Sequence, residues 1–154
     1  MKFCALINNR LIRNKFIKKK LKVFSSNLCG WFSKKKSLTE IIEREGRDIA
    51  CLTETHTKGY EKPNLEGFTS YFRNRTGDRN GGGVCLLIKK NLELETIKIC
   101  EGAEGEFVCV KINNMKKPIV MVVQYGVHAR EGTENMMLAM YYDQIHYIHS
   151  PLEY

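Results

Sequence analysis

Two short apolar runs flank a single helix pattern in the first third of the chain, and this order restricts the fold more than any other feature. Residues 21–26 have strand character and stop at Asn27, with Gly30 soon after as a turn signal. Residues 48–53 form a second such run, which Glu54 follows directly. A strand, a helix and a second strand in this order favour a parallel βαβ unit. The sequence therefore predicts an α/β fold.

The segment between the two runs carries signals for both ends of a helix. The motif Ser-Leu-Thr-Glu at residues 37–40 is typical of a capping box, which begins a helix. Leu38, Ile41 and Ile42 share one helical face, and Gly46 is a typical helix end. We therefore expect a helix from about residue 37 to Gly46.

Further strand patterns follow along the chain. A Gly-containing connection at residues 102–105 suits an antiparallel pair, so the sheet is expected to be mixed. The last of these runs is unbroken and predicts a strand covered on both faces. Residues 131–148 have apolar side chains near helical spacing, which predicts a closing helix. The strand patterns are residues 68–73, 84–88, 93–100, 106–112 and 119–123.

Basic residues are concentrated at the start of the chain. Residues 1–39 hold 11 Lys and Arg and no Asp or Glu, which leaves 25 − 11 = 14 basic and 17 acidic residues in the remainder. A basic leader on a mildly acidic domain favours attraction to polyanions such as nucleic acid. The alternative is a solvated arm that only faces water. We assign residues 1–19 as a basic N-terminal arm and residues 20–149 as the folded domain.

The six cysteines indicate a reducing environment. They contain no CxxC pair and are not spaced with histidines as a zinc site requires. Several alternate with Val, Ile or Leu, where a thiol acts as a small apolar side chain. We expect reduced thiols and an intracellular protein, nuclear or cytoplasmic. The first residues have no unbroken apolar core, so we expect no membrane segment, and no motif indicates a small-molecule cofactor.

Three polar residues end apolar runs and are the first candidates for chemistry. Asn27 and Tyr125 lie at the ends of two runs, and Glu54 directly follows a third. In α/β sheets the carboxyl ends of strands are where ligands collect, so these side chains are expected to converge. The alternative is ordinary solvation of strand ends.

Read as a set, these motifs resemble the endonuclease/exonuclease/phosphatase superfamily, which has the DNase-I-like fold. They are Asn27 in Ser-Asn-Leu-Cys-Gly, Glu54 in Leu-Thr-Glu-Thr-His, Arg-Asn-Arg at residues 73–75 with the triple glycine at residues 81–83, and Tyr125 in Val-Val-Gln-Tyr-Gly. The pattern is most similar to endonucleases of non-LTR retrotransposons. The resemblance implies a partial four-layered α/β sandwich with a mixed sheet and flanking helices. It also implies metal-dependent hydrolysis of phosphodiester bonds in DNA.

The resemblance assigns roles to the three strand-end residues. Glu54 would be the ligand of magnesium, or of manganese, and magnesium does prefer hard oxygen ligands. Asn27 would hold the phosphate or a catalytic partner through its amide. Tyr125 would donate its hydroxyl to a phosphate oxygen, although a tyrosine at a strand end is as often a packing residue. Asn27 and Tyr125 are therefore the catalytic candidates and Glu54 is the metal candidate.

A second set of residues would contact the nucleic acid. For these, an exposed surface role is the alternative, and the triple glycine is expected to be conformational because no helix start follows it. The set is His56, Arg130, Lys34 and Lys35.

The later family elements are not found. The family continues with an Asp-x-Asn pair and an Asp-His pair, but after Tyr125 the chain offers only Asp143, which no asparagine follows two residues later. Cys29 also stands where many relatives have a polar or acidic residue. We therefore expect the N-terminal part of such a domain, truncated and catalytically impaired.

Two other functions stay open from the sequence. One is a non-catalytic nucleic-acid-binding module, and the other is a non-functional retroelement fragment. A sandwich without its complete second sheet would also expose an apolar face and an edge strand, which invites self-association.

Overall fold

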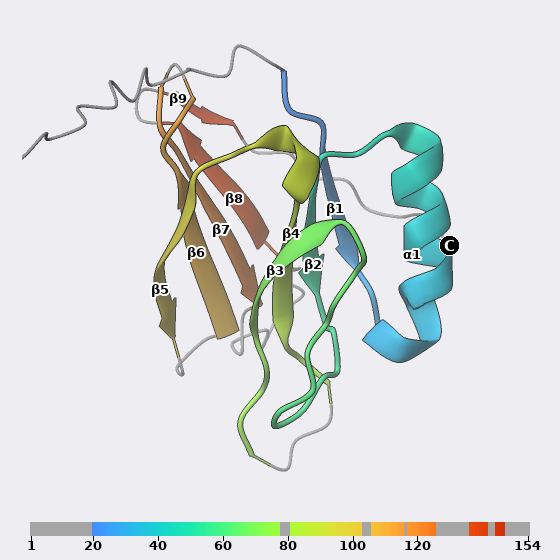
Figure 1. Cartoon of the computed structure of the whole chain (residues 1–154). Helices are drawn as coiled ribbons and strands as arrows, with labels where there is room; N and C mark the ends of the chain where they lie inside the picture. The colour runs from blue at the N-terminus through green and yellow to red at the C-terminus, as the bar shows by residue number, and fades with distance from the viewer. Residues whose placement is uncertain are drawn as a thin grey trace, which may run out of the picture.

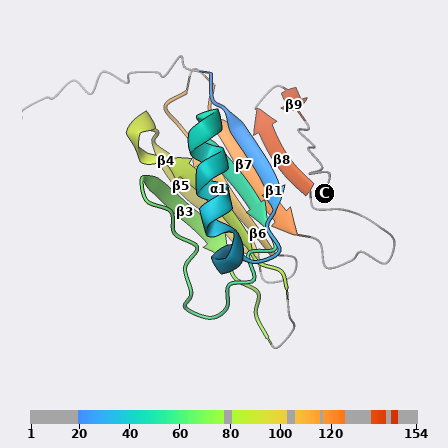
Figure 2. The ribbon, with the colours of Figure 1, turned by 90° about the vertical axis from the view of Figure 1, so that its right-hand side faces the viewer.

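Two β-sheets packed face to face and one long helix make up the part of the chain that the computed structural model describes (Figure 1). The described residues are 20–77, 81–102, 106–115, 117–125, 136–141 and 144–146. The helix, α1, lies against the outer face of the first sheet, as Figure 2 shows. The predicted α/β class and mixed sheet are confirmed. The predicted basic arm, residues 1–19, lies outside the described residues.

The first sheet contains the predicted βαβ unit. Its strands are β1 (Val23–Asn27), β2 (Ile49–Thr53), β3 (Phe68–Arg73) and β4 (Val84–Lys89), in the spatial order β1-β2-β4-β3. The first two are parallel, as a helical crossover between neighbouring strands requires. β4 is antiparallel to both of its neighbours, so the carboxyl ends of β1, β2 and β3 lie at the same edge of the sheet.

Helix α1 (Trp31–Glu45) begins earlier than the capping-box motif predicted. Trp31 is only 1% exposed and shares a buried face with Leu38 and Ile42, so burial of this face extends the helix toward its N-terminus. The motif is therefore inside the helix, where the Thr39 hydroxyl donates to the carbonyl of Lys35 at 2.8 Å. The predicted end is confirmed, since α1 is followed by Gly46 in the left-handed conformation.

The second sheet is antiparallel throughout. Its strands are β5 (Thr96–Gly102), β6 (Glu106–Ile112), β7 (Ile119–Tyr125), β8 (Met136–Tyr141) and β9 (Gln144–His146), paired in chain order. The predicted antiparallel pair is confirmed as β5 and β6. A short 3-10 helix, η1 (Lys90–Leu92), follows β4 and precedes the first strand of this sheet.

Two predictions for the last third of the chain were wrong. Residues 136–146 contain two strands where a closing helix was predicted, because β8 pairs with β7 along residues 119–124 and satisfies its backbone hydrogen-bonding groups. β7 is also not covered equally on both faces. Ile119, Met121 and Val123 are buried, whereas Val120 and Val122 are half-buried.

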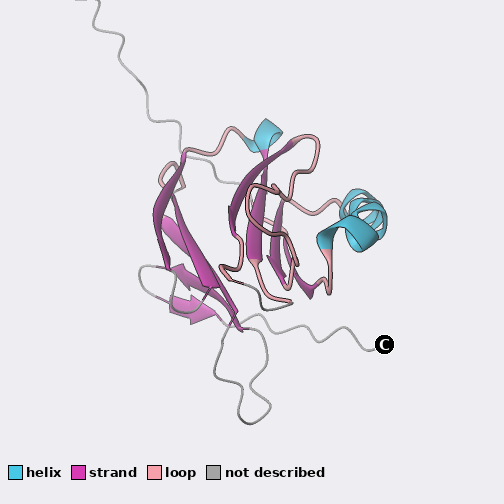
Figure 3. Cartoon of the chain, turned by 90° about the horizontal axis from the view of Figure 1, so that it is seen from below, coloured by secondary structure: helices cyan, strands magenta, loops and turns pink. Residues whose placement is uncertain are grey.

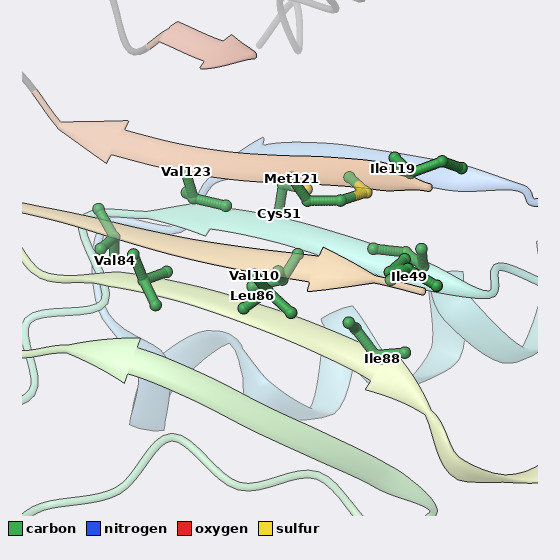
Figure 4. Close-up of a cluster of buried hydrophobic side chains, with 11 residues drawn as sticks. Ile49, Cys51, Val84, Leu86, Ile88, Val110, Ile119, Met121 and Val123 are labelled. Carbon is green, nitrogen blue, oxygen red and sulfur yellow. The ribbon is translucent and has the colours of Figure 1, made fainter. Parts of the chain in front are cut away.

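The main core lies between the two sheets. Side chains of β2 and β4 meet those of β6 and β7, and Figure 4 shows Cys51 of β2 next to Met121 of β7 and Leu86 of β4 next to Val110 of β6. A second cluster fills the space between the first sheet and α1. Leu87 belongs to that cluster, so β4 is buried on both of its faces. Sheet packing of this kind holds the strand ends of the two sheets together.

Four cysteines of the described residues are free thiols. Cys51, Cys85 and Cys109 are buried, and Cys29 is exposed. Burial raises the pKa of the Cys85 thiol to about 12 and also raises that of Cys51, so both stay protonated. These buried thiols act as small apolar side chains, as predicted. Cys4 lies outside the described residues, and the side chain of Cys100 is not described.

Within the described ranges, α1 is the only α-helix, and no helix lies on the outer face of the second sheet. Three layers of the predicted four-layered sandwich are therefore visible, namely helix, sheet and sheet (Figure 3). Self-association through the second sheet stays a prediction. In the same ranges, no helix is both long enough and apolar enough to cross a membrane.

The alternating burial of β7 predicts unequal costs for two neighbouring valines. Val123→Ala removes buried methyl groups and should lower the free energy of unfolding by about 2 kcal/mol. Val122→Ala, the matched control on the opposite face, should cost about half as much or less. Urea unfolding followed by circular dichroism measures both. Equal costs would contradict this register of β7.

Candidate active site

The strand-end residues of the two sheets meet at one end of the sandwich, the end that faces the viewer in Figure 3. Asn27 ends β1 and pairs with Thr53, the last residue of β2, so Glu54 follows at the same edge. Tyr125 ends β7 in the opposite sheet. Its hydroxyl donates to Oε1 of Glu54 at 2.5 Å. The structure thus brings together side chains that are 71 positions apart.

Glu54 accepts contacts on both of its carboxylate oxygens. Oε1 accepts the Tyr125 hydroxyl, and Oε2 accepts the thiol of Cys29 at 3.2 Å. His56 Nε2 lies 3.7 Å from Oε2, which makes an ion pair when the imidazole is protonated. The Oδ1 atom of Asn27 accepts the backbone N–H of Cys29 at 3.2 Å and lies 3.4 Å from the same thiol, whose single proton is shared between the two oxygen atoms. Cys29 therefore connects the amide to the carboxylate.

The backbone at this site is strained. Among the described residues, four that are not glycine have a positive φ, and three of these are Cys29 (47°), Glu54 (51°) and His56 (55°). The left-handed region costs such a residue on the order of 1–2 kcal/mol. The conformation is held by backbone hydrogen bonds, including Gly30 N–H to the Glu54 carbonyl at 2.9 Å. Strain concentrated in this way is typical of functional sites.

The pKa values of Glu54 and Tyr125 move in opposite directions. Partial burial is the largest influence on Glu54 and by itself raises the pKa. Hydrogen bonds from Tyr125 and Cys29, with the charge of His56 and the Asn27 amide, outweigh it, so the pKa of Glu54 is lowered. The hydrogen bond to Glu54 raises the pKa of Tyr125. At neutral pH the pair therefore consists of an ionised Glu54 carboxylate that accepts a hydrogen bond from the neutral Tyr125 phenol.

Arg75 and Glu106 form a largely buried ion pair beside Tyr125 that was not predicted from the sequence. The Arg75 Nε–H donates to Glu106, and Oε2 of Glu106 accepts the backbone N–H of Gly83 at 2.5 Å. The guanidinium carbon of Arg75 lies 5.5 Å from the centroid of the Tyr125 ring, which is a cation–π contact. A signal did exist. Glu106 begins β6 in alternation with the inward Val108, which marks an inward carboxylate that needs a partner.

The triple glycine has the conformational role that the sequence predicted. A Cβ atom at Gly82 would overlap the Arg75 guanidinium, and one at Gly83 would overlap the Thr55 hydroxyl. The carbonyl of Gly82 accepts the His56 N–H at 2.8 Å, so the glycine loop also supports the backbone of the site.

The predicted nucleic-acid-binding residues have different positions. His56 lies in the site beside Glu54. Lys34 and Lys35 are exposed in the first turns of α1, and the Lys35 ammonium lies 5.9 Å from the centroid of the Trp31 ring. Arg130 lies outside the described residues. Contact of any of these residues with nucleic acid stays a prediction.

The oxygen atoms at the site fit a hard divalent cation. Glu54 supplies a carboxylate and Asn27 an amide oxygen, and Mg²⁺ is commonly held by one or two carboxylates with water and substrate phosphate. In the described residues, no group of three or more His, Cys, Asp or Glu is placed to enclose a metal ion. These two oxygen donors are of the kind that a hard divalent cation takes when water and phosphate complete its shell.

The fold and the site together define an α/β sandwich with a carboxylate, an amide and a phenol at the ends of its strands. A profile of the Endonuclease/Exonuclease/phosphatase family matches residues 22–149. The match spans most of the chain, and the chain therefore belongs to this family. The resemblance stated from the sequence is confirmed.

Two relatives agree with this assignment. A protein described as a probable RNA-directed DNA polymerase from transposon X-element of Drosophila melanogaster is 36% identical over 73 residues, which are 47% of this chain and 8% of that protein. The crystal structure of the AP endonuclease LMAP from Leishmania major is similar with a TM-score of 0.55 and 18% identity, over 68% of this chain and 40% of that one. The chain thus spans less than half the length of each, and the second similarity concerns the fold alone.

The buried ion pair predicts a large effect of a small substitution. Glu106→Gln leaves the Arg75 guanidinium without its buried counter-charge and should lower the free energy of unfolding by about 3 kcal/mol. The exposed Glu66→Gln, as the matched control, should change it by less than about 0.5 kcal/mol. Urea unfolding at neutral pH compares the two. A cost no larger than that of the control would show that the pair is not formed.

The Tyr125 contact predicts a shift in the titration of Glu54. Tyr125→Phe removes a hydrogen bond that favours the carboxylate, so the pKa of Glu54 should rise. A lowered pKa contributes stability above the ordinary value of 4.5, and this contribution is lost as the pH falls through the pKa of the folded state. The Tyr125→Phe variant should therefore lose the stabilising contribution of Glu54 at a higher pH than the wild type does. Carboxyl ¹³C NMR, assigned with Glu54→Gln, measures the shift, and an unchanged or lower pKa would contradict the contact.

Proposed function

We propose that this chain binds a divalent metal ion and a DNA phosphodiester at the Glu54 site and contributes to metal-dependent hydrolysis of that bond. The contact between Tyr125 and Glu54 carries the proposal, because it joins a phenol donor and a carboxylate from the two sheets at one point. Membership of the Endonuclease/Exonuclease/phosphatase family supports hydrolysis of a phosphodiester bond.

Each side chain has a distinct role in this proposal. Glu54 holds magnesium or manganese, and its lowered pKa keeps it ionised and able to bind the cation at neutral pH. Such a metal ion, when bound, neutralises charge that develops on the phosphate oxygens. When the metal occupies the Glu54 carboxylate, Tyr125 would donate its single hydroxyl proton to a phosphate oxygen, and Asn27 would orient the same phosphate through its amide. Arg75 helps to position the Tyr125 ring through its cation–π contact.

Activation of the attacking water is the weakest part of the site. In the ranges that the structure describes, no second carboxylate contacts Glu54. A general base must lie within hydrogen-bonding reach of the water it activates. We therefore expect slow hydrolysis by this chain, in agreement with the expected catalytic impairment.

Nicking of supercoiled plasmid DNA tests the proposed reaction. We expect slow nicking with Mg²⁺ or Mn²⁺ that EDTA abolishes and that falls by about a hundredfold or more in Glu54→Gln, since a metal contact supplies several kcal/mol to the transition state. Glu66→Gln is the control, since Glu66 is exposed before the end of β3 opposite to the site, and this variant should nick as the wild type does. Nicking that persists in Glu54→Gln would contradict the assignment.

Binding of Mn²⁺, followed by electron paramagnetic resonance, tests the metal site without the reaction. Glu54→Gln should weaken binding, and the control Glu66→Gln should not. Metal binding without nicking would favour the non-catalytic nucleic-acid-binding module over an enzyme. A chain with neither property, and without cooperative unfolding, would be a non-functional fragment.

A further inference from the structure

A basic pocket adjoins the site along the side of the sandwich. It has a volume of about 750 Å³ and lies where the edge strands β3 and β5 of the two sheets adjoin. Both strands face the viewer in Figure 1. No Asp or Glu is among its lining residues. The charged and aromatic lining residues are Lys58, Arg73, Arg75, Lys98, Tyr71 and Phe72.

Arg75 connects the pocket to the site. Arg75 lines the pocket, and the same guanidinium lies over the ring of Tyr125, whose hydroxyl contacts Glu54. Lys58 is bridged to Arg75 through the backbone, so its side chain begins at the same end of the sandwich. Lys98 pairs with Val110 in the middle of β6, further from the site. The basic residues therefore extend from the site along the edge of the sandwich.

We propose that this pocket binds the sugar-phosphate backbone of the nucleic-acid strand that flanks the bond held at Glu54. Lysine and arginine side chains bind phosphate oxygens, and aromatic rings in a basic groove contact bases or sugars without sequence preference. Lys58 and Lys98 are exposed, whereas Tyr71 is half-buried on the face of β3 that packs toward the second sheet. The Phe72 ring packs on the opposite face, toward α1, so Tyr71 is the aromatic ring on the side of the second sheet. The identity of the ligand rests on the proposed function.

The position of the pocket adds a property that the site alone does not have. The Glu54 site holds one phosphodiester, whereas cations along β3 and β5 would hold neighbouring phosphates of the same strand. Affinity should therefore grow with oligonucleotide length and fall steeply with salt, because each phosphate contact releases counterions.

Fluorescence anisotropy with the full chain and a labelled single-stranded DNA of about 12 nucleotides tests the proposal, with EDTA present to prevent cleavage. The double variant Lys58→Gln/Lys98→Gln should bind about tenfold more weakly, or worse, at low salt. The slope of log affinity against log salt should become shallower by about 1.4, which is about 0.7 for each of two phosphate contacts on a single strand.

Lys90→Gln is the matched control. Lys90 is exposed in η1, which follows the end of β4 opposite to the site, so the substitution should leave affinity and slope unchanged. Thermal unfolding of each variant should match that of the wild type, since the exchanged lysines are exposed. Arg73→Gln, which exchanges a third cation of the pocket, should weaken binding further.

The outcomes separate this proposal from the proposed function. Equal affinity and slope in Lys58→Gln/Lys98→Gln and Lys90→Gln would overturn the pocket as a strand-binding surface, whatever the nicking assay shows. Loss of nicking in Glu54→Gln with normal binding would leave both proposals standing. Weaker binding in the double variant without any nicking would retain the pocket and reject the hydrolytic function.

Discussion

Apolar packing between the two sheets is the interaction on which everything else in this molecule depends. Glu54 belongs to the first sheet and Tyr125 to the second, and no local sequence signal joins them. They meet because Cys51 and Leu86 of one sheet share a packed core with Met121 and Val110 of the other, which fixes the distance between the sheets. A hydrogen bond of 2.5 Å across this junction requires a core that does not slide. The chemistry at the strand ends is thus set by the fit of aliphatic side chains far from it.

The site also shows how a fold supports unfavourable local geometry. Left-handed backbone at Cys29, Glu54 and His56 is costly, yet each position is tied to neighbouring strands and loops by hydrogen bonds. The result is a carboxylate whose two oxygens point at different donors. A relaxed strand end would turn Glu54 to one face of the sheet, as ordinary alternation does. The left-handed backbone instead lets the side chain reach Tyr125 of the second sheet.

Some of this was predictable from the sequence, and the reasons for the rest are physical. Asn27, Glu54 and Tyr125 could be placed at strand ends because apolar runs stop there. The start of α1 was wrong because burial of Trp31 outweighed a local capping motif. The closing helix was wrong because pairing with the free edge of β7 outweighed helical spacing. Glu106 could be recognised as an inward carboxylate, but its partner Arg75 depends on how the sheets pack, which no local pattern contains.

The close approach of the glycine loop has a genetic consequence. Gly82 and Gly83 have no room for a Cβ atom, since Arg75 and Thr55 occupy the space, and both have positive φ. Every amino acid other than glycine carries that atom. Every change in the first or second base of these two codons therefore disturbs the Arg75 contact or the Thr55 contact, unless it creates a stop codon. At these two positions the structure depends on the absence of a side chain.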